Sequence, residues 1–148
     1  MRLVLDTSVV AKWSLEEQDS AAARRVLYDI EAGVVEAHNS TLPSFEWLNA
    51  LTKGLDRLDD VHHSLHLFDG LVARNALTQH PASSPALLHA ATLASLDTRS
   101  QGQVSAYDAV FPALAPDSDA TLITADAAHV HKTEGAFSAV VLLSEYAS

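Results

Sequence analysis

Two aspartates stand at the ends of short apolar runs, where their side chains could do chemistry. Asp6 directly follows Leu3–Leu5, and Asp126 follows the segment 120–124 after one alanine. Unbroken apolar runs are typical of strands buried on both faces of a parallel sheet, and ligands bind at the carboxyl ends of such strands. Carboxylates that meet at one edge repel each other, and a proton or a hard cation such as Mg²⁺ or Mn²⁺ relieves that repulsion. The spacing therefore predicts an acidic site at one edge of a sheet.

Every candidate acid also has a purely structural explanation. Asp6 and Asp126 are suited to cap the helices that we expect after them. Asp108 stands three residues after Ser105, which is the spacing of a capping box. Glu46 lies opposite the leucine face of its expected helix, so periodicity predicts that it faces solvent. From the residues alone, both interpretations stay open.

The elements that must position these acids alternate between strand-like and helix-like segments. We expect strands over 3–5, 34–37, 76–78, 120–124 and 139–143. We expect helices from about residue 9 and over 19–32, 43–58, 61–72, 84–96 and 127–131, with a short helix from residue 105 and a loop over 101–104. Strands separated by helices imply right-handed crossovers and a parallel sheet covered on both faces. Residues 1–148 are therefore predicted to form one domain of the α/β class, a three-layer α/β/α sandwich with a central parallel sheet.

The composition limits the environment of the protein. The chain has 148 residues, no cysteine and a formal net charge of −10. The absence of cysteine excludes a disulfide framework and suits a reducing compartment. No apolar stretch approaches the roughly 18 residues that a membrane helix needs, and the first residues do not form a secretory signal. We therefore expect a cytoplasmic protein.

Four short segments, at 4–8, 42–51, 105–109 and 122–126, each carry one of the acids among characteristic neighbours. They read VLDTS, LPSFEWLNAL, SAYDA and LITAD, and Ala113–Ala115 follows the third. In this order and spacing they resemble the PIN-domain family, and within it the VapC-type toxin ribonucleases of type II toxin–antitoxin systems. The resemblance spans nearly the whole chain.

The resemblance implies a PIN-like fold and a metal-dependent endoribonuclease that cleaves RNA phosphodiester bonds. It implies Mg²⁺ or Mn²⁺ as the cofactor, a cognate antitoxin with a basic or amphipathic tail as a partner, and a homodimer. Carried over residue by residue, it assigns metal binding and catalysis to an acidic quartet, with two polar supports. The quartet is Asp6, Glu46, Asp108 and Asp126, and the supports are Ser8 and Thr124.

The chain departs from the family pattern near Asp108 and in its overall charge. Phe111 stands where a tyrosine is common, and Pro112 cannot donate the helical hydrogen bond to the carbonyl of Asp108. We therefore expect the helix there to kink, start late or stop early. The net negative charge argues against a broad basic surface for RNA. Lys12 and Lys53 are the cations nearest the acid-bearing segments, and either is a candidate for a phosphate contact.

Other functions fit parts of the same sequence. A catalytically silent PIN-like module that acts by binding a protein is the main alternative. A haloacid-dehalogenase-type phosphatase also has an aspartate after its first strand, but it needs a second aspartate where this chain has Ser8.

Two groups of side chains outside the quartet have both functional and structural interpretations. His62, His63 and His66, with Asp69 beyond them, could bind zinc or nickel, but a solvated helix face explains them equally well. The two tryptophans, Trp13 and Trp47, could stack on bases, although packing in the core is the more usual role.

Overall fold

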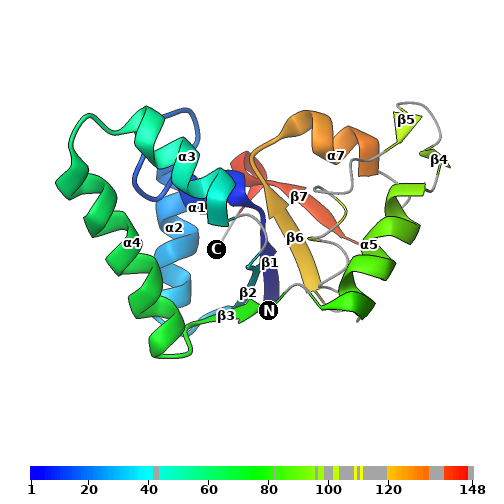
Figure 1. Cartoon of the computed structure of the whole chain (residues 1–148), viewed down its shortest axis with the longest axis horizontal. Coiled ribbons are helices and arrows are strands. Elements are labelled where there is room, and N and C mark those ends of the chain that lie inside the picture. Colours follow the sequence, from blue (N-terminus) through cyan, green and yellow to red (C-terminus); the bar gives the residue numbers. More distant parts are fainter. Residues whose placement is uncertain are drawn as a thin grey trace.

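A parallel five-stranded sheet forms the centre of the protein, as a computed structural model shows (Figure 1). The structure describes residues 1–41, 44–81, 83–95, 97–98, 102–103, 109, 111, 120–133 and 139–146. The strands are β1 (Arg2–Leu5), β2 (Glu36–Ser40), β3 (Leu77–His80), β6 (Ala120–Thr124) and β7 (Val140–Leu142). Their order is β3-β2-β1-β6-β7, and every neighbouring pair is parallel. The predicted α/β fold with a central parallel sheet is confirmed.

Helices cover both faces of this sheet, so the molecule has three layers. In Figure 1, α2, α3 and α4 lie on one side of the strands, and α5 and α7 lie on the other. The described helices are α1 (Thr7–Ala11), α2 (Ser20–Glu31), α3 (Ser44–Gly54), α4 (Leu58–Ala73), α5 (Ser84–Ser95), α7 (Ala127–Thr133) and the 3₁₀ helix η1 (Leu143–Glu145). Among the described residues, no helix is long and apolar enough to cross a membrane.

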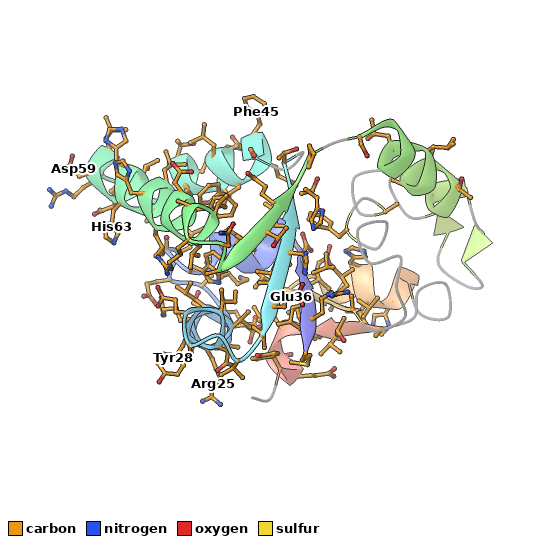
Figure 2. All side chains as sticks on the ribbon, turned by 90° about the horizontal axis from the view of Figure 1, so that it is seen from below. Arg25, Tyr28, Glu36, Phe45, Asp59 and His63 are labelled. Carbon is orange, nitrogen blue, oxygen red and sulfur yellow. The ribbon has the colours of Figure 1, made fainter. Side chains whose placement is uncertain are left out.

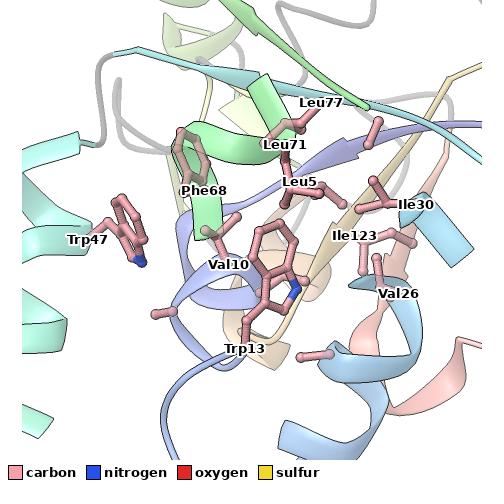
Figure 3. Packing of buried hydrophobic residues seen from close by; sticks show 14 of the residues in the cluster. Leu5, Val10, Trp13, Val26, Ile30, Trp47, Phe68, Leu71, Leu77 and Ile123 are labelled. Carbon is pink, nitrogen blue, oxygen red and sulfur yellow. The ribbon is translucent and has the colours of Figure 1, made fainter. Parts of the chain in front are cut away.

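The central position of β1 in the sheet explains why its apolar run has no polar interruption. Leu3, Val4 and Leu5 are all fully buried. Leu3 and Leu5 belong to the large core cluster on the side of α1 to α4, part of which Figure 3 shows, whereas Val4 packs with Phe111 and other residues in a second cluster. Burying each such side chain stabilises the fold by about 1.5–3 kcal/mol.

The helix predicted over 43–58 ends earlier in the structure, and the next helix begins earlier than expected. The helix α3 ends at Gly54 and α4 begins at Leu58, which is 67% exposed instead of continuing the leucine stripe. A Cβ at position 54 would lie 2.6 Å from Leu15 Cδ2. Glycine therefore lets the end of α3 pack closely against the loop that carries Leu15.

Several other expected boundaries shift by a few residues. β2 covers residues 36–40 instead of 34–37, because the chain first turns at Gly33, where φ is +70°. The loop predicted over 101–104 is wrong in part, since Gly102–Gln103 form strand β5, which pairs antiparallel with β4 (Asp97–Thr98). The short helix expected from residue 105, including the expected disturbance at Pro112, lies outside the described residues, apart from the buried Ala109 and Phe111.

Candidate active site

Asp6 lies where β1 ends and α1 begins, at the carboxyl edge of the sheet. Its backbone amide donates to Ile123 O of the neighbouring strand at 3.1 Å, which continues the β1–β6 register by one residue. Its side chain caps α1, because Oδ1 accepts a hydrogen bond from Ser8 N at 3.3 Å. Asp6 thus has the structural role that its residue type predicts, but this bond uses only one oxygen of the carboxylate.

The other carboxylate oxygen of Asp6 receives two hydroxyl groups. Thr124 Oγ1 donates to Asp6 Oδ2 at 2.5 Å, and Ser8 Oγ donates to the same atom at 3.0 Å. Ser8 Oγ also accepts from Ala125 N at 3.0 Å. The two hydroxyl groups predicted as polar supports therefore meet at Asp6, and they connect the turn after β1 to the turn after β6.

His129 of α7 completes the surroundings of this carboxylate. It is 3% exposed, and its Nδ1 lies 3.8 Å from Asp6 Oδ2. Burial raises the pKa of the Asp6 carboxyl, but interactions with His129, Thr124 and Ser8 outweigh burial and hold the pKa below its ordinary value. Asp6 is therefore a buried carboxylate that stays ionised at neutral pH.

His129 is a site residue that the sequence pattern does not indicate. The short helix α7 has too few turns for its buried face to show in a periodic pattern. The position of His129, three residues after Asp126, was the one indication in the sequence. A helix that starts at the end of a strand places its first turn above the edge of the sheet.

Asp126 lies near the same edge and caps α7. Its Oδ1 accepts hydrogen bonds from Ala128 N at 2.8 Å and His129 N at 3.3 Å, and its backbone amide donates to Thr124 Oγ1 at 3.1 Å. Thr124 thus contacts both Asp6 and Asp126. The carboxylate of Asp126 is exposed, and its Oδ2 has no described hydrogen bond.

The other two acids of the predicted quartet have different positions. Glu46 lies in the first turn of α3, a helix that packs against α1, and its side chain is exposed. Asp108 lies outside the described residues. Among the residues that the structure describes, no group of three or more His, Asp and Glu side chains forms a ready metal site.

The donor atoms near Asp6 fit a hard divalent cation. A carboxylate has about four lone-pair sites, and the Asp6 carboxylate accepts three described hydrogen bonds, only one of them at Oδ1. Asp6 and Asp126 offer oxygen atoms, which are the ligands that Mg²⁺ and Mn²⁺ prefer. These two acids could hold such a cation together with further acids.

A pocket lies beside Asp6 at the carboxyl ends of β1, β2 and β3. Two polar atoms of its lining residues, Thr7 Oγ1 and Trp47 Nε1, are buried without a hydrogen-bond partner among the described residues. Asn39 also lines it, and its Nδ2 donates to Leu5 O at 3.1 Å. Sequence patterns did not indicate this pocket, because its residues come from five separate elements.

The tryptophans belong to the core. Trp13 is 6% exposed and Trp47 is 9% exposed, and the Trp47 ring packs on Phe68 with 4.8 Å between ring centroids. Figure 3 shows both indoles among the buried side chains. Neither ring has an exposed face on which a base could stack in this structure.

The histidine group on α4 lies on a solvated face. His62, His63 and His66 are exposed, as is Asp69, and Figure 2 shows His63 pointing away from the body of the protein. The solvated-face interpretation fits this placement.

Many basic side chains are paired with acids on the surface. Lys12 Nζ lies 2.8 Å from Glu17 Oε2, and Arg24 and Arg74 pair with Glu16 and Glu31. The exposed Lys53 in the last turn of α3 has no ion pair among the described residues. Of the two lysines that were candidates for a phosphate contact, Lys53 is the one that remains available.

Comparison with solved structures supports this architecture. The fold is similar to that in the structure of FitAB bound to an IR36 DNA fragment, with a TM-score of 0.67, 16% identity, and coverage of 99% of this chain and 98% of that chain. FitAcB from Neisseria gonorrhoeae has a TM-score of 0.67 at 15% identity, with 97% and 99% coverage. VapBC2 from Rickettsia felis, bound to a DNA fragment from their promoter, has a TM-score of 0.63 at 14% identity, with 96% and 98% coverage.

These similarities concern the fold. The PIN-like α/β/α sandwich implied by the sequence resemblance is confirmed, and the similarity extends over nearly the full length of the chain. No protein-family model matches this sequence, and no curated protein matches it.

Proposed function

We propose that this protein is a metal-dependent endoribonuclease of the VapC type, acting as the toxin of a toxin–antitoxin pair. The observation that carries the proposal is the environment of Asp6. A buried carboxylate that stays ionised lies at the carboxyl edge of a PIN-like sheet, and Ser8 and Thr124 fix its orientation. A buried carboxylate that is held in one orientation is explained better as a ligand for a cation than as a helix cap alone.

In this proposal the acidic quartet holds Mg²⁺ or Mn²⁺. Asp6 provides the buried ligand, and Asp126, Glu46 and Asp108 complete the site either directly or through water. When bound, the cation lowers the pKa of a water molecule and polarises the scissile phosphate. Ser8 and Thr124 keep the Asp6 carboxylate ordered, so the ligand is positioned before substrate arrives. Lys53 is the lysine available to contact the RNA backbone.

The proposed partners follow from the fold and the charge. The three solved structures compared above are toxin–antitoxin complexes, and this chain is acidic, with a net charge of −10. An antitoxin with a basic or amphipathic tail would be attracted to such a surface. We propose that the protein acts in the cytoplasm, where its RNA substrate is found, and that it forms a homodimer.

A catalytically silent binding module is the second candidate. The capping of α7 by Asp126 favours it, because one acid of the quartet has a structural role that requires no metal. Metal dependence distinguishes the two candidates. A module binds its protein partner equally well with a chelator present, whereas a nuclease requires the cation to cut RNA.

The test is cleavage of a mixed small-RNA substrate by purified protein with Mn²⁺, with EDTA, and after the substitution Asp6→Asn. We expect cleavage with Mn²⁺ only, and its loss in Asp6→Asn. Asp69→Asn on the exposed face of α4 is the matched control and should cut at the wild-type rate. Cleavage that persists in EDTA contradicts metal dependence, and absence of both cleavage and Mn²⁺ binding favours the binding module.

A further inference from the structure

A second cluster of titratable side chains lies on β2 and β3. His38 Nδ1 and His80 Nε2 are 2.8 Å apart, and the two rings are stacked with 5.1 Å between centroids. The strand register pairs His38 with Thr78 and His80 with Ser40, so the histidines are offset by two residues. This offset places both side chains on the same face of the sheet, since successive side chains of a strand alternate between faces.

Glu36 determines which nitrogen of His38 carries its hydrogen. His38 Nε2 lies 3.0 Å from Glu36 Oε1, and the same carboxylate pairs with Arg2 at 3.3 Å. An ionised carboxylate only accepts hydrogen bonds, so His38 Nε2 is the donor. In the neutral ring, the lone pair is then on Nδ1, the atom that faces His80. Histidines that bind metals are commonly oriented in this way by a carboxylate behind them.

His80 is also suited to be a neutral ligand. Burial lowers the pKa of His80, and the nearby His38 lowers it further, which favours the neutral ring. Without a metal, His80 Nε2–H donates to the lone pair of His38 Nδ1. If a cation takes the place of that hydrogen, the hydrogen moves to His80 Nδ1, and both facing nitrogens become donors to the metal with no net loss of a proton.

We propose that His38 Nδ1 and His80 Nε2 are the two protein ligands of a Zn²⁺ site, with water in the remaining positions. Zn–N bonds of about 2.0–2.1 Å in tetrahedral geometry separate two ligand atoms by roughly 3.3 Å. The two nitrogens therefore need to separate only slightly from their present 2.8 Å. Both side chains are partly buried, with 12% of the His38 side chain exposed, so the site keeps access to solvent.

This site differs in chemistry from the candidate active site. Imidazole nitrogens favour zinc and similar transition metals, whereas the carboxylate oxygens around Asp6 favour Mg²⁺ and Mn²⁺. The zinc proposal does not depend on the nuclease proposal, and each can fail while the other holds.

The experiment is calorimetric titration of Zn²⁺ into the full chain without a histidine tag. We expect binding that is lost in His38→Gln and in His80→Gln. Glu36→Gln should weaken it by about tenfold or more, because it removes the carboxylate that orients His38. The double variant His62→Gln/His66→Gln on α4 and the variant Asp6→Asn are controls, and both should keep the binding.

Nitrogen NMR of the wild-type histidines provides a second measurement that needs no variant. Without zinc, His38 should be protonated at Nε2, and zinc should shift the resonances of His38 Nδ1 and His80 Nε2. Circular dichroism checks that each variant is folded. If a variant is not folded, the NMR measurement on the wild type tests the proposal in its place. The proposal is overturned if the wild type does not bind zinc, if binding is lost only in the α4 double variant, or if other histidine resonances shift instead.

Discussion

The hydroxyl of Thr124, at the end of β6, donates a hydrogen bond to the buried carboxylate of Asp6, which is 118 residues away in the sequence and follows β1. Because β1 and β6 are parallel neighbours, the residues after both strands meet at one edge of the sheet. This contact links the two segments whose acids form part of the proposed quartet.

Removing the Thr124 hydroxyl should weaken both stability and cleavage. The substitution Thr124→Val keeps the shape of the side chain but removes a hydrogen bond to a buried charge, which costs about 1.5–3 kcal/mol of unfolding free energy. The proposed function predicts slower RNA cleavage as well, because the orientation of Asp6 is less fixed. Urea unfolding and a cleavage assay measure the two effects. The control is Thr121→Val on the same strand, and equal losses in both variants would refute a specific role for Thr124.

Two substitutions of Asp126 can separate its role as a helix cap from its proposed role in catalysis. Asparagine caps a helix about as well as aspartate, whereas alanine does not. Asp126→Asn should therefore keep the unfolding free energy within a few tenths of a kcal/mol, and Asp126→Ala should lower it by about 1 kcal/mol. If the charge of Asp126 serves catalysis, both variants lose cleavage. A fully active Asp126→Asn would show that Asp126 is only a cap.

Tyr146 attaches the C-terminal segment to α2. Its hydroxyl donates to Asp29 Oδ2 at 2.8 Å, and Asp29 is buried. Replacing Tyr146 by phenylalanine leaves this carboxylate without that donor, so we expect Tyr146→Phe to lower the unfolding free energy by about 1–3 kcal/mol. Tyr28→Phe is the matched control, because Tyr28 is 69% exposed. Equal stability of the two variants would contradict a structural role for the Tyr146 hydrogen bond.

The same contact predicts a dependence of stability on alkaline pH. Burial and the Asp29 carboxylate raise the pKa of Tyr146 from 10.0 to about 12. The unfolded chain therefore releases this proton first, and the contribution of Tyr146 to stability, complete below pH 10, is lost as the pH rises through about 12. Urea unfolding at pH 9 and at pH 11.5 should show a larger fall for the wild type than for Tyr146→Phe. Identical falls in the two proteins would contradict the raised pKa.

The parallel sheet was predictable because buried strands need apolar runs. Leu3, Val4 and Leu5 are all buried, so β1 lacks the alternation of a strand with one solvated face, and such an apolar run is typical of the centre of a parallel sheet. The end of α3 at Gly54 was missed although glycine commonly ends helices, because the leucine spacing continues to Leu58 in the sequence.

The candidate site could be predicted only in part. Asp6 and Asp126 follow strands, and this position indicates their common edge, whereas Ser8 and Thr124 were assigned by the family resemblance. The burial of His129 beside Asp6 and the pairing of His38 with His80 depend on how separate elements pack. Neither contact is indicated by a local sequence pattern.

A Mn²⁺ titration by calorimetry combined with RNA cleavage, using the wild type and Asp6→Asn, tests whether Asp6 holds the catalytic metal. The wild type should bind Mn²⁺ and cut RNA, and the folded variant should do neither. Mn²⁺ binding and cleavage that both survive in Asp6→Asn would contradict the assignment of Asp6 as the buried ligand of the active site.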